Sequence, residues 1–132
     1  MCPRFRAALV LVCALSVAPA LAHHSLQAQF DVTKPVTLTG VVTKVEWMNP
    51  HVHLYLEVDD GHGTVSKWAL VSLGTSMLRR GGVTKQMLDV GETVTVVAYH
   101  AKDGLNLGFL RKIRFAQGHE VEIWLGDPTK AK

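Results

Sequence analysis

The sequence contains only two cysteines, Cys2 and Cys13, and both fall close to its start. They cannot build a disulfide framework or a cysteine-based zinc finger. Charge is also scarce, since only 19% of the residues are Asp, Glu, Lys or Arg, while 48% are hydrophobic. This composition excludes a disordered chain. The length of 132 residues suits one domain and is too short for two ordinary cores.

Residues 1–22 have the three-part layout of a secretory signal peptide. Arg4 and Arg6 supply the positive start, Ala7–Val17 is an apolar stretch, and Ala20-Leu21-Ala22 is a small-x-small cleavage site. The apolar stretch is shorter than the ~20 residues that a membrane-spanning helix needs. We therefore expect cleavage after Ala22, export to the periplasm, and no membrane span in the mature chain.

The mature chain would have almost no net charge. Cleavage removes two arginines and leaves 12 Lys and Arg against 11 Asp and Glu. A nucleic-acid-binding protein needs a concentrated basic face, so this balance argues against nucleic acid as a partner. The mature chain also lacks a G-x-S-x-G motif, a phosphate-binding glycine loop and any cysteine. The sequence therefore favours a role other than catalysis.

Alternating apolar and polar residues predict a mainly β domain over residues 36–126. The expected helical segments are short, at Leu73–Arg80 and Thr84–Leu88. The expected strands are Val36–Trp47, His51–Asp59, Thr64–Val71, Thr93–His100, Leu107–Phe115 and Val121–Leu125. Gly40 interrupts the alternation of the first strand, which predicts a β-bulge or a sharp coil of the strand there.

This order of elements predicts a small OB-like barrel of five to six strands with one short helix. A barrel also removes the exposed sheet edges that an open sheet of this size would have. A two-sheet sandwich is the alternative. We expect residues 23–35 to form an irregular lead-in, with Pro35 fixing the entry to the first strand, and residues 127–132 to form a flexible tail.

Five short stretches resemble a known family. They are residues 22–25 (AHHS), 30–31 (FD), 38–51 (LTGVVTKVEWMNPH), 78–81 (LRRG) and 101–104 (AKDG). Together they resemble a family of small exported bacterial proteins known only as a domain of unknown function. The resemblance implies a periplasmic OB-like barrel and no particular activity. Members of that family usually have a bulky apolar or aromatic residue where this chain has His53, so the resemblance favours His51 over His53 as a functional residue.

The predicted mature N-terminus is the first candidate site, because histidine is the commonest metal-ligating side chain. Cleavage after Ala22 gives His23 a free α-amine beside its own imidazole, with His24 next in the chain. The amine and the His23 imidazole would chelate one ion, and a further imidazole would complete a three-nitrogen histidine brace. Alternatively, the amine, the His24 amide and the His24 imidazole would surround the ion. Nitrogen-only ligand sets of this kind favour Cu(II).

The second candidate site is Asn49-Pro50-His51-Val52-His53. Residues two apart on a strand face the same side, so His51 and His53 are expected to reach one ion. A solvated strand face gives the same pattern. The two candidates form one site only if the lead-in brings His23 to His51. The resulting hypothesis is an exported barrel that sequesters or delivers copper through His23, His24, His51 and His53.

A second hypothesis from another functional class stays open. The barrel face around Trp47 would hold a periplasmic protein or an oligosaccharide, and the protein would act as a binding or assembly module. Loss of a captured partner on substitution of Trp47 would favour this hypothesis over metal binding.

Overall fold

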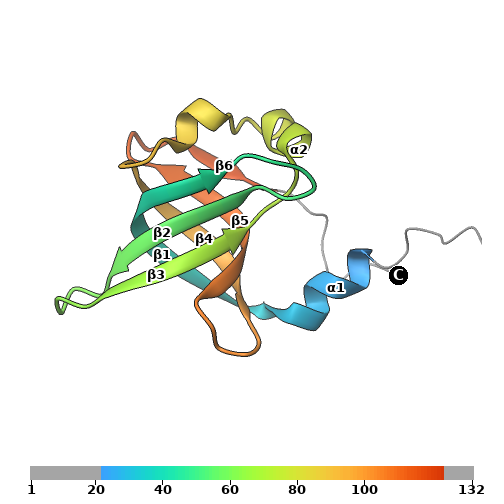
Figure 1. The fold of residues 1–132 in the computed structure, drawn as a ribbon, viewed down its shortest axis with the longest axis horizontal. Helices are drawn as coiled ribbons and strands as arrows, with labels where there is room; N and C mark the ends of the chain where they lie inside the picture. Colours follow the sequence, from blue (N-terminus) through green and yellow to red (C-terminus); the bar gives the residue numbers. More distant parts are fainter. Residues whose placement is uncertain (1–21, 124–132) are drawn as a thin grey trace, which may run out of the picture.

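A computed structural model describes residues 22–123 of the chain, with side chains described from Leu26 onward. Six strands and three short helical segments follow one another along this part of the chain (Figure 1). They are α1 (Ala22–Gln29), β1 (Phe30–Glu46), β2 (His53–Asp59), β3 (Val65–Val71), α2 (Thr75–Arg80), the 3-10 turn η2 (Lys85–Leu88), β4 (Thr93–Ala101), β5 (Leu107–Phe115) and β6 (Glu120–Glu122). In this range no helix combines the length and the apolar character needed to cross a bilayer.

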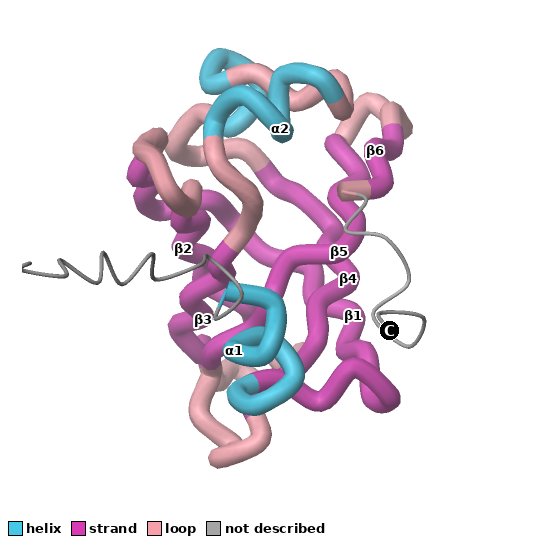
Figure 2. Tube along the Cα trace, turned by 90° about the vertical axis from the view of Figure 1, so that its right-hand side faces the viewer, coloured by secondary structure: helices cyan, strands magenta, loops and turns pink. Residues whose placement is uncertain are grey.

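The strands form one sheet in the order β3-β2-β1-β4-β5-β6, with antiparallel neighbours. Parallel pairing of β3 with β5, from Ala69↔Leu107 to Val71↔Phe109, joins the two sides of this sheet. Figure 2 shows the strands wrapped round a common interior, with α2 above them. The predicted OB-like barrel with a helix between its third and fourth strands is therefore confirmed, and the sandwich alternative is not.

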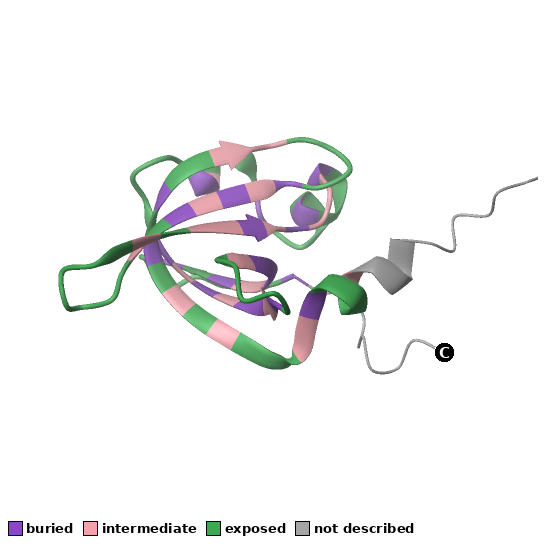
Figure 3. Ribbon diagram, turned by 60° about the horizontal axis from the view of Figure 1, so that its bottom comes forward, coloured by how far each residue is buried: buried purple, intermediate pink, exposed green. Residues whose placement is uncertain are grey.

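The period-two pattern of the sequence matches the burial of the strands. In and before β2, Val52, Leu54 and Leu56 are buried, while the odd-numbered residues between them lie on the outer face. Figure 3 shows the same alternation along several strands. The inner faces and the underside of α2 and η2 form one main core, which includes Leu70 and Leu78. Burial of this apolar surface is the principal stabilising term for the barrel.

The irregularity of β1 is not at Gly40, where a bulge is predicted. The register with β2 shifts between Val42 and Lys44, so the inward face runs through Val42 and resumes at Val45. Gly40 instead allows a close approach between two strands. A Cβ there would lie 2.6 Å from the Glu57 carbonyl oxygen, so only glycine allows β1 to pass this close to β2.

The predicted irregular lead-in is also wrong, because residues 22–29 form α1 and β1 begins at Phe30. Phe30 is buried in a second, smaller core with Tyr99, Ala101 and Phe109, and Leu26 of α1 packs against it. The rings of Phe30 and Phe109 meet edge to face with centroids 5.9 Å apart. This long-range contact orders the segment before Pro35. The predicted tail, residues 127–132, lies outside the described residues.

Candidate functional site

The Asn-Pro-His corner between β1 and β2 is fastened to the start of α2. The Asn49 side-chain oxygen accepts hydrogen bonds from the Thr75 backbone N–H (3.0 Å) and the Thr75 hydroxyl (3.1 Å). Gly74 allows this approach, since a Cβ there would lie 2.8 Å from the same oxygen. Two backbone hydrogen bonds continue the contact: the Val52 N–H donates to Leu73 (3.1 Å) and the Ser72 N–H donates to Val52 (2.9 Å). The corner is thus a fixed loop.

His51 lies in this loop with an exposed side chain. Its Nδ1 is 2.9 Å from the Ser72 carbonyl oxygen. A carbonyl oxygen only accepts, so Nδ1 donates its proton and the lone pair of the neutral ring is on Nε2. Metal-binding histidines are commonly oriented in this way, by a hydrogen bond from the ring nitrogen that does not bind the metal.

His53 begins β2 and is half-buried, with 33% of its side chain exposed. Its Nδ1 is shielded from solvent, makes no hydrogen bond, and lies 3.9 Å from a Glu46 carboxylate oxygen. Only Nε2 is therefore a candidate donor to an ion.

Glu46 is held by two other partners. Lys44 donates to one of its carboxylate oxygens (2.5 Å) and the Tyr55 hydroxyl to the other (3.1 Å). The Lys44 hydrogen bond and then the Tyr55 hydrogen bond lower the pKa of Glu46 below 4.5. The pKa of Tyr55 is raised above 10.0, chiefly because burial disfavours its charged form and to a smaller extent because its hydroxyl donates to Glu46. Lys44, Glu46 and Tyr55 therefore form one connected polar group on the outer face.

The structure describes the side chains of only two of the four predicted ligands, His51 and His53. The backbone of His23 and His24 lies in the first turn of α1, but their side chains lie outside the described residues. β2 begins only at His53, whereas His51 lies in the preceding loop with its ring turned to Ser72, so only His53 of the two lies on a strand. Among the described side chains, no group of three or more His, Cys, Asp or Glu is arranged to hold a metal.

The helix that carries the N-terminal histidines has a neighbour in common with the His51 corner. Leu26 of α1 and Leu73 both pack against the small core around Phe30. The Leu73 carbonyl also accepts the hydrogen bond from Val52, the residue after His51. Both helices lie on the right-hand side of Figure 1, α2 at the top and α1 at the bottom, and Figure 2 shows α2 above α1. The sequence could not reveal this link, because it depends on contacts between distant segments.

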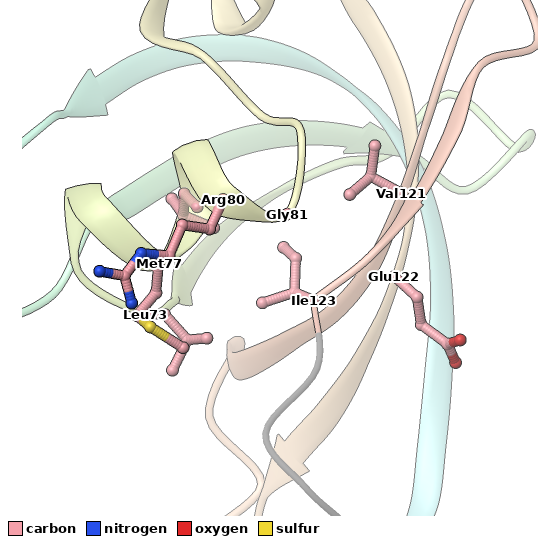
Figure 4. Close-up of a pocket in the computed structure, with 8 residues that line it drawn as sticks. Leu73, Met77, Arg80, Gly81, Val121, Glu122 and Ile123 are labelled. Carbon is pink, nitrogen blue, oxygen red and sulfur yellow. The ribbon is translucent and has the colours of Figure 1, made fainter.

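An apolar pocket of about 180 Å³ lies between α2 and the end of β6 (Figure 4). Its walls include Leu73, Met77 and Leu78 on one side and Val121 and Ile123 on the other. Arg80 and Glu122 also line it, and Ile123 is the last described residue. Trp47, the centre of the binding face expected from the sequence, is half-buried and packs against the main core.

The comparison with protein families matches residues 10–111 to "Family of unknown function (DUF6152)". The chain belongs to DUF6152. This confirms the resemblance found in the sequence motifs. A comparison with curated protein sequences found no match.

Among solved structures, this DUF6152 chain is similar to the mitochondrial single-stranded DNA binding protein Rim1 of S. cerevisiae, with a TM-score of 0.51. The two sequences are 10% identical, and the match covers 65% of this chain and 96% of that one. It also matches part of a complex of TiaS with a tRNA and ATP, with a TM-score of 0.46 and 18% identity over 65% of this chain and 19% of that one. The first likeness supports the OB-like fold of the DUF6152 chain.

Proposed function

We propose that this DUF6152 protein is exported, loses residues 1–22, and then binds one copper ion. The ligands are the α-amine and imidazole of His23 together with the imidazole of His51. In the alternative planar arrangement they are the α-amine, the His24 amide and the His24 imidazole. His53 is the further candidate ligand. The protein would sequester or deliver the ion.

The observation behind this proposal is the hydrogen bond from His51 Nδ1 to the Ser72 carbonyl. It fixes the ring in an exposed loop and leaves the lone pair of Nε2 available. The loop itself is held by Asn49, so little conformational entropy would be lost on binding.

The position of α1 adds a second argument. His23 precedes Leu26 by three residues, less than one turn of helix, and Leu26 packs against the core that Leu73 also contacts. The described side chains form no complete ligand group, so a copper site at His51 needs further nitrogens from elsewhere. In this proposal the processed terminus supplies them.

Copper titration of the processed protein tests the proposal. We expect one Cu(II) per chain with a nitrogen-rich electron paramagnetic resonance spectrum. Replacing His51 with alanine should weaken Cu(II) binding by about tenfold or more, as loss of a contact worth ~1.4 kcal/mol does. Acetylation of the α-amine should weaken it similarly, because an acetylated nitrogen no longer has a lone pair to donate to the ion.

His62→Ala is the matched control, since His62 is exposed in the turn between β2 and β3. It should leave Cu(II) affinity unchanged. Equal affinity in the wild type, His51→Ala and the N-terminally acetylated protein would refute the histidine site. The intact mass of the exported protein must also correspond to a chain that starts at His23.

A second role is favoured by a different feature, a groove of about 340 Å³ on the outer face of β1, β2 and β3. We propose that this groove, rather than the surface around Trp47, is the ligand-binding face of the barrel. Its volume is at the lower end of the ~300–1,000 Å³ range of small-molecule sites. This role is independent of the histidines.

A further inference from the structure

The groove crosses three strands at the front of the barrel in Figure 1, where α1 and α2 lie beside the sheet rather than over it. Lys44 comes from β1, Tyr55 and Glu57 from β2, and Lys67 and Ala69 from β3. Asn106, in the loop between β4 and β5, closes one side. A ligand in the groove would therefore run across the strands and not along a sheet edge.

The register of the strands creates the hollow. Tyr55 lies opposite Lys44 on one side and opposite Ala69 on the other. The Lys44 ammonium lies over the Tyr55 ring, 5.2 Å from its centre. On the other side Ala69 has only a methyl group, so space remains beside the Tyr55 ring and above the sheet.

The Tyr55 ring is fixed before any ligand arrives. Its hydroxyl donates to Glu46, and the second Glu46 oxygen accepts from Lys44. These bonds join Lys44, Glu46 and Tyr55 into the polar group described above. An aromatic surface held in this way loses little rotamer freedom when a ligand packs on it.

The rim provides both hydrogen-bond donors and acceptors. Lys67 and Glu57 are exposed register partners on neighbouring strands, and they make no ion pair with each other. The Asn106 side chain adds an amide, and its backbone carbonyl is fixed by the Ala69 N–H at 3.0 Å. Hydroxyl groups are suitable partners for all three side chains.

The charges of the groove and of Glu46 beside it balance. Lys44 is paired with Glu46, and Lys67 lies opposite Glu57. A polyanion such as single-stranded nucleic acid needs an excess of positive charge, which this face does not have. An extended peptide that adds to a sheet needs an open edge, whereas the groove lies on the face of the sheet. A ligand with many hydroxyls, no charge and an apolar ring face fits the groove best.

Resting on the proposed second role, we infer that the groove binds a short, uncharged oligosaccharide. One sugar ring would stack against Tyr55 above Ala69. Its hydroxyls, and those of the neighbouring rings, would bond to Lys67, Glu57 and Asn106.

The test is a binding screen of the processed protein by NMR and calorimetry. The probes are neutral hexose and N-acetylhexosamine oligosaccharides from disaccharide to hexasaccharide, with single-stranded DNA and a set of unstructured peptides for comparison. We expect saturable binding of at least one neutral oligosaccharide, insensitive to added salt. The amide signals of Tyr55, Lys67 and Ala69 should shift.

Two variants localise the binding. Ala69→Phe fills the hollow and should weaken binding of that oligosaccharide by about tenfold or more. Lys67→Ala removes an exposed hydrogen-bond donor without touching the core, so it should weaken binding even if Ala69→Phe folds poorly. Thr37→Phe is the control, because Thr37 is exposed on β1 where β1 pairs with β4 instead of β2, and it should bind as the wild type does.

The outcomes separate the two proposals. DNA or peptide binding at the same residues, without oligosaccharide binding, would overturn the carbohydrate assignment and retain the groove as a ligand site. No binding of any probe at millimolar concentration would overturn both, as would oligosaccharide binding that neither Ala69→Phe nor Lys67→Ala weakens.

Discussion

At the scale of single residues, neighbouring members of the Asn-Pro-His corner have different tasks. Asn49 uses its side-chain oxygen to hold Thr75 at the start of α2. His51 uses one ring nitrogen to bind Ser72 and leaves the other to the solvent. The motif is therefore explained in part by structure alone, and only the free nitrogen of His51 needs a functional explanation.

The first prediction concerns Asn49. Asn49→Ala leaves the Thr75 N–H and hydroxyl without their acceptor, and Thr75 is buried. We expect a loss of about 1–3 kcal/mol in the free energy of unfolding, measured by urea denaturation. Asn49→Asp keeps an acceptor oxygen at this place and should lose less. Equal losses in the two variants would show that the hydrogen bonds are not the cause.

The second prediction concerns pH. Because the pKa of Glu46 in the folded protein is below its usual 4.5, its bonds to Lys44 and Tyr55 stabilise the fold fully above about pH 4.5. That stabilisation is lost as the pH falls through the lowered pKa. We expect the free energy of unfolding to fall less steeply on acidification in Glu46→Gln than in the wild type. Parallel curves would contradict this role of Glu46.

At the scale of elements, β1 shows what an alternating pattern predicts and what it leaves open. Its existence follows from Val and Thr content, and its even-numbered apolar residues point inward as far as Val42. Val41 and Val42 are adjacent valines, so the pattern alone does not locate the change of face. The site of the bulge is decided by pairing, because β1 leaves β4 and joins β2 at Val41.

The third prediction concerns this crossing. Gly40→Ala would place a Cβ 2.6 Å from the Glu57 carbonyl and 2.9 Å from a Val58 methyl. Since the nearest atom belongs to the backbone, β1 and β2 must move apart, and we expect a loss of about 1–3 kcal/mol in thermal or urea unfolding. Thr37→Ala, on the exposed face of the same strand, should cost less than about 1 kcal/mol. A neutral Gly40→Ala would disprove the close approach.

At the scale of the whole molecule, local patterns predict the barrel, while its functional surfaces depend on long-range contacts. The strands, α2 and the OB-like arrangement follow from alternation and turn residues. The groove depends on Tyr55 lying opposite Ala69, and α1 depends on Phe30 meeting Phe109. Neither pairing has a local signal, so the sequence indicated Trp47 instead of Tyr55 and predicted an irregular lead-in.

The fourth prediction links the ion to the stability of the whole fold. A ligand that binds only the folded state stabilises it by about 2.7 kcal/mol at a concentration one hundred times its Kd. Cu(II) should therefore raise the melting temperature of the processed protein more than that of the same protein with an acetylated N-terminus. An equal shift in both would mean that copper binds elsewhere, for example at His62 or His119.

The central claim is that the processed N-terminus and His51 hold one copper ion together. The most direct measurement is a crystal structure of the processed protein with Cu(II), with the metal located by its anomalous scattering. The account predicts one peak within bonding distance, about 2 Å, of His51 Nε2 and the α-amine of His23. A chain that begins at another residue, or a peak bonded to other histidines with His51 unligated, would contradict it.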